Sequence, residues 1–298
     1  DMSAMFNTAS AFNQDISGWV VDSVTDMGAM FEEASSFNQD ISGWAVDKVT
    51  NMYEMFNDAR AFDQDISGWT VNSVTNMYRM FRRAWSFNQD ISGWAVDSVT
   101  DMSKMFRFTA FNQDIGGWAV DKVTSMYQMF RSASAFDQDL GDWAVHSVTD
   151  MSWMFNGGSF NQDISAWVVH SATSMQQMFD HAYAFDQDLG WCVGDDVNLH
   201  WAFTYTQCEA TSCGVVRCST KGKEQTPVAI IAGAAAAAAL LLAVGAFCFY
   251  RRRKASMADK ADEPSGANPE PTELSAPVVA ISIKEQLATI LIAPEAEE

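Results

Sequence analysis

The sequence predicts a repeat solenoid with coils of about 25 residues, followed by one transmembrane helix. Sixteen of its 17 methionines belong to one recurring motif, and only Met257 lies outside it. A stretch of 23 uncharged residues, Val228 to Tyr250, follows the repeats. The clearest marker is a tryptophan that recurs once in each repeat, at Trp19, Trp44, Trp69, Trp94, Trp118, Trp143, Trp167 and Trp191.

Each repeat contains a segment with helical periodicity. In the copy that ends at Trp44, Met27, Met30, Phe31 and Ala34 have the spacing i, i+3, i+4 and i+7, which predicts a helix of about two turns with one apolar face. The preceding residue is of a helix-capping type in successive copies: Asp26, Asn51, Asn76, Asp101, Ser125, Asp150 and Ser174.

A Val-Thr pair before each capping residue favours a very short strand, as at Val24-Thr25. A strand and helix this short cannot bury a core alone, so each coil must stack on its neighbours. The fold class is therefore a short parallel strand plus a short helix per coil. Residues 1–203 form the predicted solenoid ectodomain, and Val197–Phe203 is a decaying ninth copy.

Residues 190–226 are predicted to form a cysteine-rich C-terminal cap and stalk. Four cysteines outside the regular repeats favour two disulfides, in one of three pairings. A zinc site is the competing interpretation, although the spacing lacks paired C-x2-C motifs. The four candidates are Cys192, Cys208, Cys213 and Cys218.

Residues 227–250 form the predicted transmembrane helix, because 23 uncharged residues span about 35 Å as a helix. The basic cluster 251–254 indicates a type I protein in the plasma membrane, with the repeats outside and a disordered cytoplasmic tail at 251–298. Alanine-rich helices pack closely in lipid, so this helix is a candidate for homodimer formation. The chain begins at Asp1 in mid-repeat, so we expect a fragment or a processed form.

The formal net charge of −20 excludes nucleic acid as an expected partner and favours cations or basic partners. No nucleophile–base pair, phosphate loop or metal triad is present, so we expect neither an enzyme nor a cofactor. One aspartate per repeat forms a predicted column. We interpret it as a turn-stabilising ladder, with calcium binding as the alternative. Its members are Asp15, Asp40, Asp65, Asp90, Asp114, Asp139, Asp163 and Asp188.

Variable positions of the fourth to sixth copies carry a cluster of basic residues, named here the basic island. One interpretation is compensation of nearby acids such as Glu54 and Asp58. The other is a docking patch for an acidic protein or polysaccharide, since arginine and aromatic residues are enriched at contact surfaces. The candidate binding residues are Arg79, Arg82, Arg83, Lys104, Arg107 and Arg131, with Trp85 beside them.

The pattern Met-x-x-Met-Phe, followed by Phe-Asn-Gln-Asp-Ile-Ser-Gly-Trp and Val-Thr, resembles the Met-Phe type of BspA-like leucine-rich-repeat surface protein. The resemblance covers residues 1–203. It implies a leucine-rich-repeat-like solenoid on a cell surface that mediates adhesion to, or recognition of, an extracellular protein or glycan. It supplies no catalytic residues. The alternative function is that of a structural, calcium-binding protein of the cell envelope.

Overall fold

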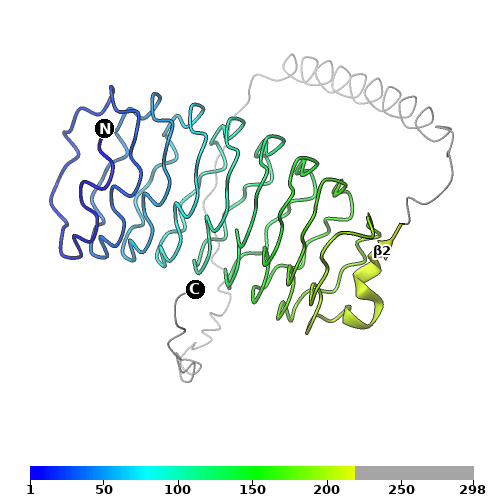
Figure 1. Cartoon of the computed structure of the whole chain (residues 1–298). Coiled ribbons are helices and arrows are strands. Elements are labelled where there is room, and N and C mark those ends of the chain that lie inside the picture. The colour runs from blue at the N-terminus through cyan, green and yellow to red at the C-terminus, as the bar shows by residue number, and fades with distance from the viewer. Residues whose placement is uncertain (219–298) are drawn as a thin grey trace, which may run out of the picture. The chain divides into compact units, whose positions relative to one another are not determined.

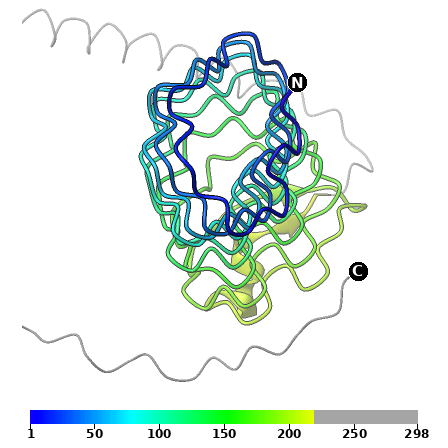
Figure 2. The same cartoon turned by 90° about the vertical axis from the view of Figure 1, so that its left-hand side faces the viewer.

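The computed structural model describes residues 1–218, in which successive repeats form coils stacked one upon another (Figure 1). Seen from the N-terminal end, the coils follow one another with similar outlines (Figure 2). Regular elements of this part occur only at its C-terminal end: β1 (Cys192–Val193), η1 (Glu209–Gly214) and β2 (Val216–Arg217). β1 and β2 form a parallel pair.

Neighbouring coils are joined by single parallel bridges at the predicted capping position. Each bridged residue pairs with its equivalent in the next coil, so the register equals the sequence repeat. The adjacent threonines also pair, as where the Thr50 amide donates to the Thr25 carbonyl at 2.9 Å. In place of the predicted Val-Thr strand, each pair of neighbouring coils therefore has only a single bridge and the adjacent threonine hydrogen bond. The bridges run Asp26 to Asn51, Asn76, Asp101, Ser125, Asp150, Ser174 and Asn198.

The predicted helix is wrong for the Met-Phe segment, defined by Met27–Ala34 and its equivalents. The structure has turns there and no α-helix anywhere in residues 1–218. Alternate amides donate sideways: those of Met27, Ala29, Phe31 and Glu33 reach carbonyls of the next coil at 2.7–3.1 Å. Amides that bond between coils cannot also complete an i to i−4 helical ladder.

The remaining amides of this segment close local turns. Those of Met30 and Ala34 donate to carbonyls three residues earlier, at 3.2 and 3.1 Å. The third and seventh positions have a left-handed backbone, with φ of 54° at Ala29 and 57° at Glu33. The apolar spacing therefore buries the same residues as a helix would, through a chain of turns.

The side chain of a capping-type residue accepts a hydrogen bond from the backbone amide two residues later, which bonds neither to the next coil nor within a turn. The Asp26 side chain accepts the Gly28 amide at 2.8 Å, and Asn76 accepts that of Tyr78 at 2.9 Å. Such Asx turns use the same side-chain chemistry as a helix N-cap. The capping-type residue therefore accepts a backbone amide, as a helix N-cap would. The segment that follows it, however, is a chain of turns and not a helix.

The core is a continuous stack of equivalent side chains from successive coils. Phe31, Phe56 and Phe81 are fully buried, with neighbouring ring centroids 5.7 and 5.6 Å apart. The indole nitrogen of each recurring tryptophan from Trp44 onward donates to a backbone carbonyl of the preceding coil, as from Trp69 to Ile41 at 3.1 Å. Burying each large side chain contributes about 1.5–3 kcal/mol.

A polar ladder runs beside this core through the Asn or Asp that follows the second phenylalanine. The Asn38 side chain accepts the backbone amide of Asp63 at 2.9 Å and the side-chain amide of Gln64 at 2.9 Å. Asp63 accepts the amide of Asn88 in the same way, at 3.0 Å. Asn and Asp serve equally because only the accepting oxygen is used.

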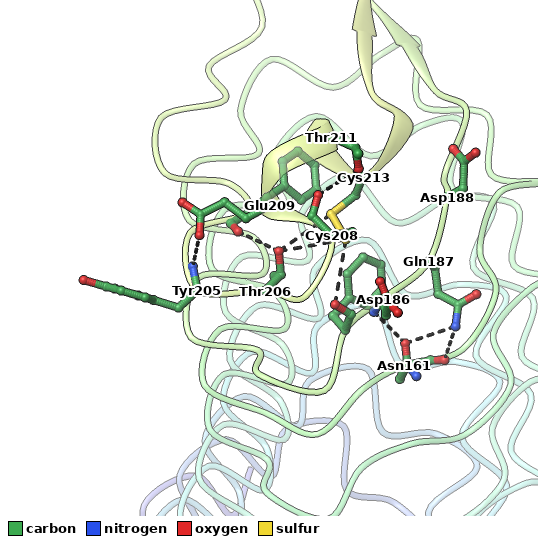
Figure 3. Close-up of a disulfide and its surroundings, with 12 residues drawn as sticks. Asn161, Asp186, Gln187, Asp188, Tyr205, Thr206, Cys208, Glu209, Thr211 and Cys213 are labelled. Carbon is green, nitrogen blue, oxygen red and sulfur yellow. Dashed lines mark hydrogen bonds between the residues drawn. A yellow bond between two sulfur atoms is a disulfide. The ribbon is translucent and has the colours of Figure 1, made fainter.

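The C-terminal cap covers the last coil. The predicted ninth copy pairs in register, since the Met175 amide donates to Asn198 at 2.8 Å. One disulfide joins Cys192 to Cys218 across β1 and β2. A second joins Cys208 to Cys213 in and beside η1 (Figure 3). All four predicted cysteines are thus in disulfides, and the pairing left open by the sequence is resolved.

No helix within residues 1–218 is long and apolar enough to cross a membrane. The rest of the predicted stalk, the transmembrane helix at 227–250 and the tail at 251–298 lie outside the described residues.

Candidate functional site

The basic island lies on the Met-Phe segments of the fourth to sixth coils. Its six basic side chains are all half-buried, and Trp85 is 50% exposed. Arg79, Arg83 and Lys104 occupy left-handed positions with φ between 54° and 60°. Neighbouring Met and Phe residues point into the core, so the turns direct the variable residues outward.

Two arginines of the island compensate acids of the preceding coil. Arg79 pairs with Glu54 at 2.7 Å, and Arg83 lies 3.6 Å from Asp58. Asp58 also pairs with Arg60 at 2.6 Å. The compensation interpretation therefore fits the edge of the island nearest the N-terminus.

Three basic residues at the centre of the island have no such partner. Among residues 1–218, Arg82, Lys104 and Arg107 form no ion pair with any carboxylate. The buried Nε atoms of Arg82 and Arg107 also make no hydrogen bond there. Arg82 donates one bond, from Nη1 to the Asn57 side chain at 3.3 Å. Direct ion pairs therefore do not compensate this centre, although the charge of Glu54 acts on Arg82 and Lys104.

Aromatic rings, and not carboxylates, lie beside two of these cations, Lys104 and Arg107. The Arg107 guanidinium lies over Phe108, 4.5 Å from the ring centroid. The Lys104 ammonium lies between Tyr78 and Tyr127, at 5.7 and 5.2 Å. Cation–π contacts of this kind orient a charge while leaving it available to an anion.

The crowding of positive charge alters the acid–base properties of the island. Burial, together with the charges of Arg79, Arg107 and Arg82, lowers the pKa of Lys104 to about 8. Burial also lowers the pKa of Arg107 to about 10, with further contributions from Arg131, Arg82 and Arg83. Both groups are cationic at neutral pH, in surroundings that a bound anion would stabilise.

Arg82, Arg107 and Arg131 occupy the sixth position of three consecutive Met-Phe segments and are named here the arginine column. Polar residues continue it in both directions. The Glu32 carboxylate accepts Asn57 at 2.9 Å on one side. On the other side Arg131 donates to Asn156 at 3.2 Å, and Asn156 donates to the Asp180 carboxylate at 3.2 Å. The column is thus a basic interval between two acidic ends.

The predicted aspartate column forms a ladder of Asx turns. In every copy the Oδ1 atom accepts the backbone amide two residues on, as from Ser42 to Asp40 at 2.9 Å. The hydrogen bonds to Ser42 lower the pKa of Asp40, against the opposing charges of Asp15 and Asp65. Within residues 1–218 no group of three or more metal-ligating side chains could hold an ion.

Two residues of the site were missed by sequence reasoning. Arg60 pairs with Asp58 and lies over Trp85, 4.6 Å from the ring centroid. Phe108 lies beneath the guanidinium groups of Arg107 and Arg83. Aligning the repeats would have found both, since Arg60 and Trp85 stand at equivalent positions of neighbouring repeats, as do Arg83 and Phe108.

Stacked coils in register with the sequence repeat define this chain as a repeat protein. A family model described as "Mycoplasma protein of unknown function, DUF285" matches residues 1–110 and 75–192, and the chain belongs to this family. No curated protein matches the chain, and neither does any solved structure.

Proposed function

We propose that this chain is a single-pass cell-surface protein whose stacked coils recognise or bind an extracellular ligand through the basic island. The proposal takes the repeats to be a leucine-rich-repeat-like solenoid of the BspA-like type, held outside the plasma membrane by the helix at 227–250. The repeat pattern and the basic cluster after the uncharged stretch support this arrangement.

The observation that carries the proposal is the uncompensated centre of the island. A chain of net charge −20 has ample carboxylates, yet Arg82, Lys104 and Arg107 form no ion pair among residues 1–218. Half-burying three like charges together is unfavourable for folding. An anionic ligand would offset that cost, and protein surfaces that bind anions are arranged in this way.

A binding screen of the full chain, in a neutral detergent, against cell-surface proteins and glycans tests the proposal. The column variant, Arg82→Asn with Arg107→Asn, removes two charges and inserts the residue that Asn57 supplies at the same repeat position. The control variant, Lys48→Ser with Lys122→Ser, removes two exposed charges and inserts the residue that Ser73 supplies at theirs.

We expect the column variant to lose at least one interaction that the control variant keeps. Thermal unfolding of both variants checks that each is folded, which the repeat-derived replacements favour. If every interaction survives in the column variant, the island is not the contact surface and the proposal is wrong.

A further inference from the structure

An exposed aromatic patch lies on the last coils of the stack, apart from the basic island. It consists of Tyr183, Trp201 and Tyr205, which are 65, 58 and 56% exposed. Trp201 and Tyr205 have the left-handed backbone, with φ of 54° and 61°, that directs variable residues outward elsewhere in the stack. Tyr183 and Tyr205 both contact the His181 ring, at centroid distances of 5.7 and 4.6 Å. The two tyrosines therefore form one cluster, and Trp201 belongs to the same Met-Phe segment as Tyr205.

The exposure of these rings is not that of an uncovered core. The C-terminal cap covers the end of the core stack, where Phe203 is 8% exposed and Cys213 is fully buried. The Tyr205 ring points away from the cap (Figure 3). Other coils have mostly polar or small residues at its position, such as Asp58 and Ser132. The aromatic patch is thus a feature of the variable surface that the packing of the core does not require.

A short covalent tether limits how far this end of the stack can lie from a membrane. The disulfide to Cys192 and the bond from the Cys218 amide to the Val193 carbonyl, at 2.9 Å, hold Cys218 against the last coils. Eight residues, 219–226, join it to the predicted transmembrane helix, and a segment of that length spans about 30 Å at most. With that helix in a bilayer, the last coils are held close to the lipid headgroups.

The side chains and the charge of these coils fit one kind of lipid surface. Tyrosine and tryptophan are enriched at membrane interfaces, because a ring with an apolar body and a polar edge suits the headgroup level. Residues 180–218 contain six acidic residues and one arginine, so anionic headgroups would repel this end of the stack. A zwitterionic surface accepts the rings without that repulsion.

The place of the patch in the stack determines how such a contact would orient the molecule. Trp201 and Tyr205 belong to the last Met-Phe segment, at the edge where this face of the stack meets its C-terminal end. Arg107 lies four coils earlier, about 19 Å along the stack. A contact at the edge tilts the stack and leaves the basic island clear of the membrane.

We propose that the aromatic patch is a membrane-contact surface, at which Tyr183, Trp201 and Tyr205 enter the headgroup region of a zwitterionic bilayer and set the tilt of the stack. This inference rests on the proposed function, because it takes the helix at 227–250 to span the membrane.

Tryptophan quenching tests this inference, with the full chain reconstituted in vesicles of phosphatidylcholine brominated near the headgroup end of its acyl chains. Bromine quenches a tryptophan only at close range. Trp201→Gln inserts the residue that Gln177 supplies at the same repeat position. The control, Trp85→Ser, inserts the residue that Ser134 supplies at its position. Trp85 is 50% exposed and lies five coils earlier than Trp201, about 24 Å along the stack.

We expect the quenched fraction of the emission to fall in Trp201→Gln, by at most the share of one tryptophan in 11, and not to fall in Trp85→Ser. Tyr183→Ser with Tyr205→Ser keeps every tryptophan and should also lower the quenched fraction, because the contact itself is weakened. Brominated phosphatidylserine should quench less than brominated phosphatidylcholine. Thermal unfolding checks that each variant is folded.

Three results would overturn the inference. They are equal quenched fractions in the wild type and Trp201→Gln, equal falls in the two tryptophan variants, and loss in Trp201→Gln of a ligand found in the binding screen, which would assign the patch to that ligand. Washing the vesicles at alkaline pH, which releases proteins that do not span the bilayer, separates this failure from that of the proposed function. If the chain is retained, the proposed function stands; if it is released, the single-pass arrangement is wrong and the inference with it.

Discussion

Lys104 illustrates how the repeat determines the chemistry of one residue. It follows Ser103, a small residue at a position where the coils before and after it have Tyr78 and Tyr127. The lysine therefore lies between two rings rather than in solvent, among the charges of the island. Its lowered pKa follows from that placement.

The pKa of Lys104 is lowered to about 8 by burial and by the charges of Arg79, Arg107 and Arg82, against the weaker attraction of Glu54. This lowered pKa predicts that the stability of the fold depends on pH. The unfolded chain has the ordinary lysine pKa of about 10.4, so it binds more protons between pH 8 and 10. The free energy of unfolding should therefore rise with pH in that window. Denaturant unfolding of the wild type and of Lys104→Gln measures this, and an equally steep rise in the variant would contradict it.

Adjacent glycines in the seventh coil provide a matched test of the turn geometry. Gly157 has φ of +64°, whereas Gly158 lies where most other copies have alanine. Gly157→Ala should lower the free energy of unfolding by about 1 kcal/mol, because a Cβ is unfavourable in the left-handed region. Gly158→Ala should be neutral or stabilising by up to about 1 kcal/mol. Denaturant unfolding compares the two, and equal effects would contradict the turn geometry.

Sequence reasoning found most of the site at the residue scale. Arg82 and Arg107 were identified because they stand at variable positions, which face outward when the fixed ones form a core. Arg60 and Phe108 were missed because one partner of each, Trp85 for Arg60 and Arg83 for Phe108, is a side chain one coil away. Contacts between equivalent positions become visible only when the copies are aligned one above another.

At the element scale, the backbone conformation of the Met-Phe segment cannot be predicted from a single coil. Its i, i+3, i+4 and i+7 pattern correctly identified the buried residues, and all four of Met27, Met30, Phe31 and Ala34 are fully buried. The backbone conformation depends on whether an amide bonds within the segment or to a carbonyl one coil away, as Met27 does to Asn51. Local periodicity does not distinguish these two hydrogen-bonding patterns, because a series of turns buries one face of the segment just as a helix does.

Asn38 allows a test of the polar ladder that holds neighbouring coils together. Asn38→Ala removes the acceptor of the Asp63 amide and should cost about 1–3 kcal/mol of stability. Asn38→Asp keeps the accepting oxygen, as Asp63 itself does, and should cost much less. The free energy of unfolding in denaturant measures both, and equal losses would show that the accepting oxygen does not stabilise the stack.

At the scale of the whole described molecule, each coil contacts only its neighbouring coils. A substitution that destabilises one end of the stack should therefore leave the other end folded. The Cys192–Cys218 disulfide closes a loop with a sequence separation of 26, and loops of this length contribute about 3–4 kcal/mol. Replacing both cysteines by alanine should therefore raise amide exchange in the last coils and leave that near Phe56 and Phe81 unchanged. Uniformly faster exchange would indicate that the stack unfolds as one unit.

The same architecture separates stability from recognition. Fixed positions form the phenylalanine stack, the tryptophan bonds and two polar ladders, and each recurs in nearly every coil. Variable positions are free to change, and three consecutive copies use one of them for arginine. Sequence reasoning predicted this division, but the uncompensated centre required the distances between coils.

The central claim is that the arginine column makes ionic contacts with the ligand, and the salt dependence of binding tests it most directly. Each released ionic contact contributes about 0.7–0.9 to the slope of log affinity against log salt concentration for a polyanion. With a polyanionic ligand found in the binding screen, the slope should be smaller in magnitude by about one to two in the column variant than in the wild type. It should be unchanged in the control variant. A wild-type slope in the column variant, or equal reductions in both variants, would contradict the claim.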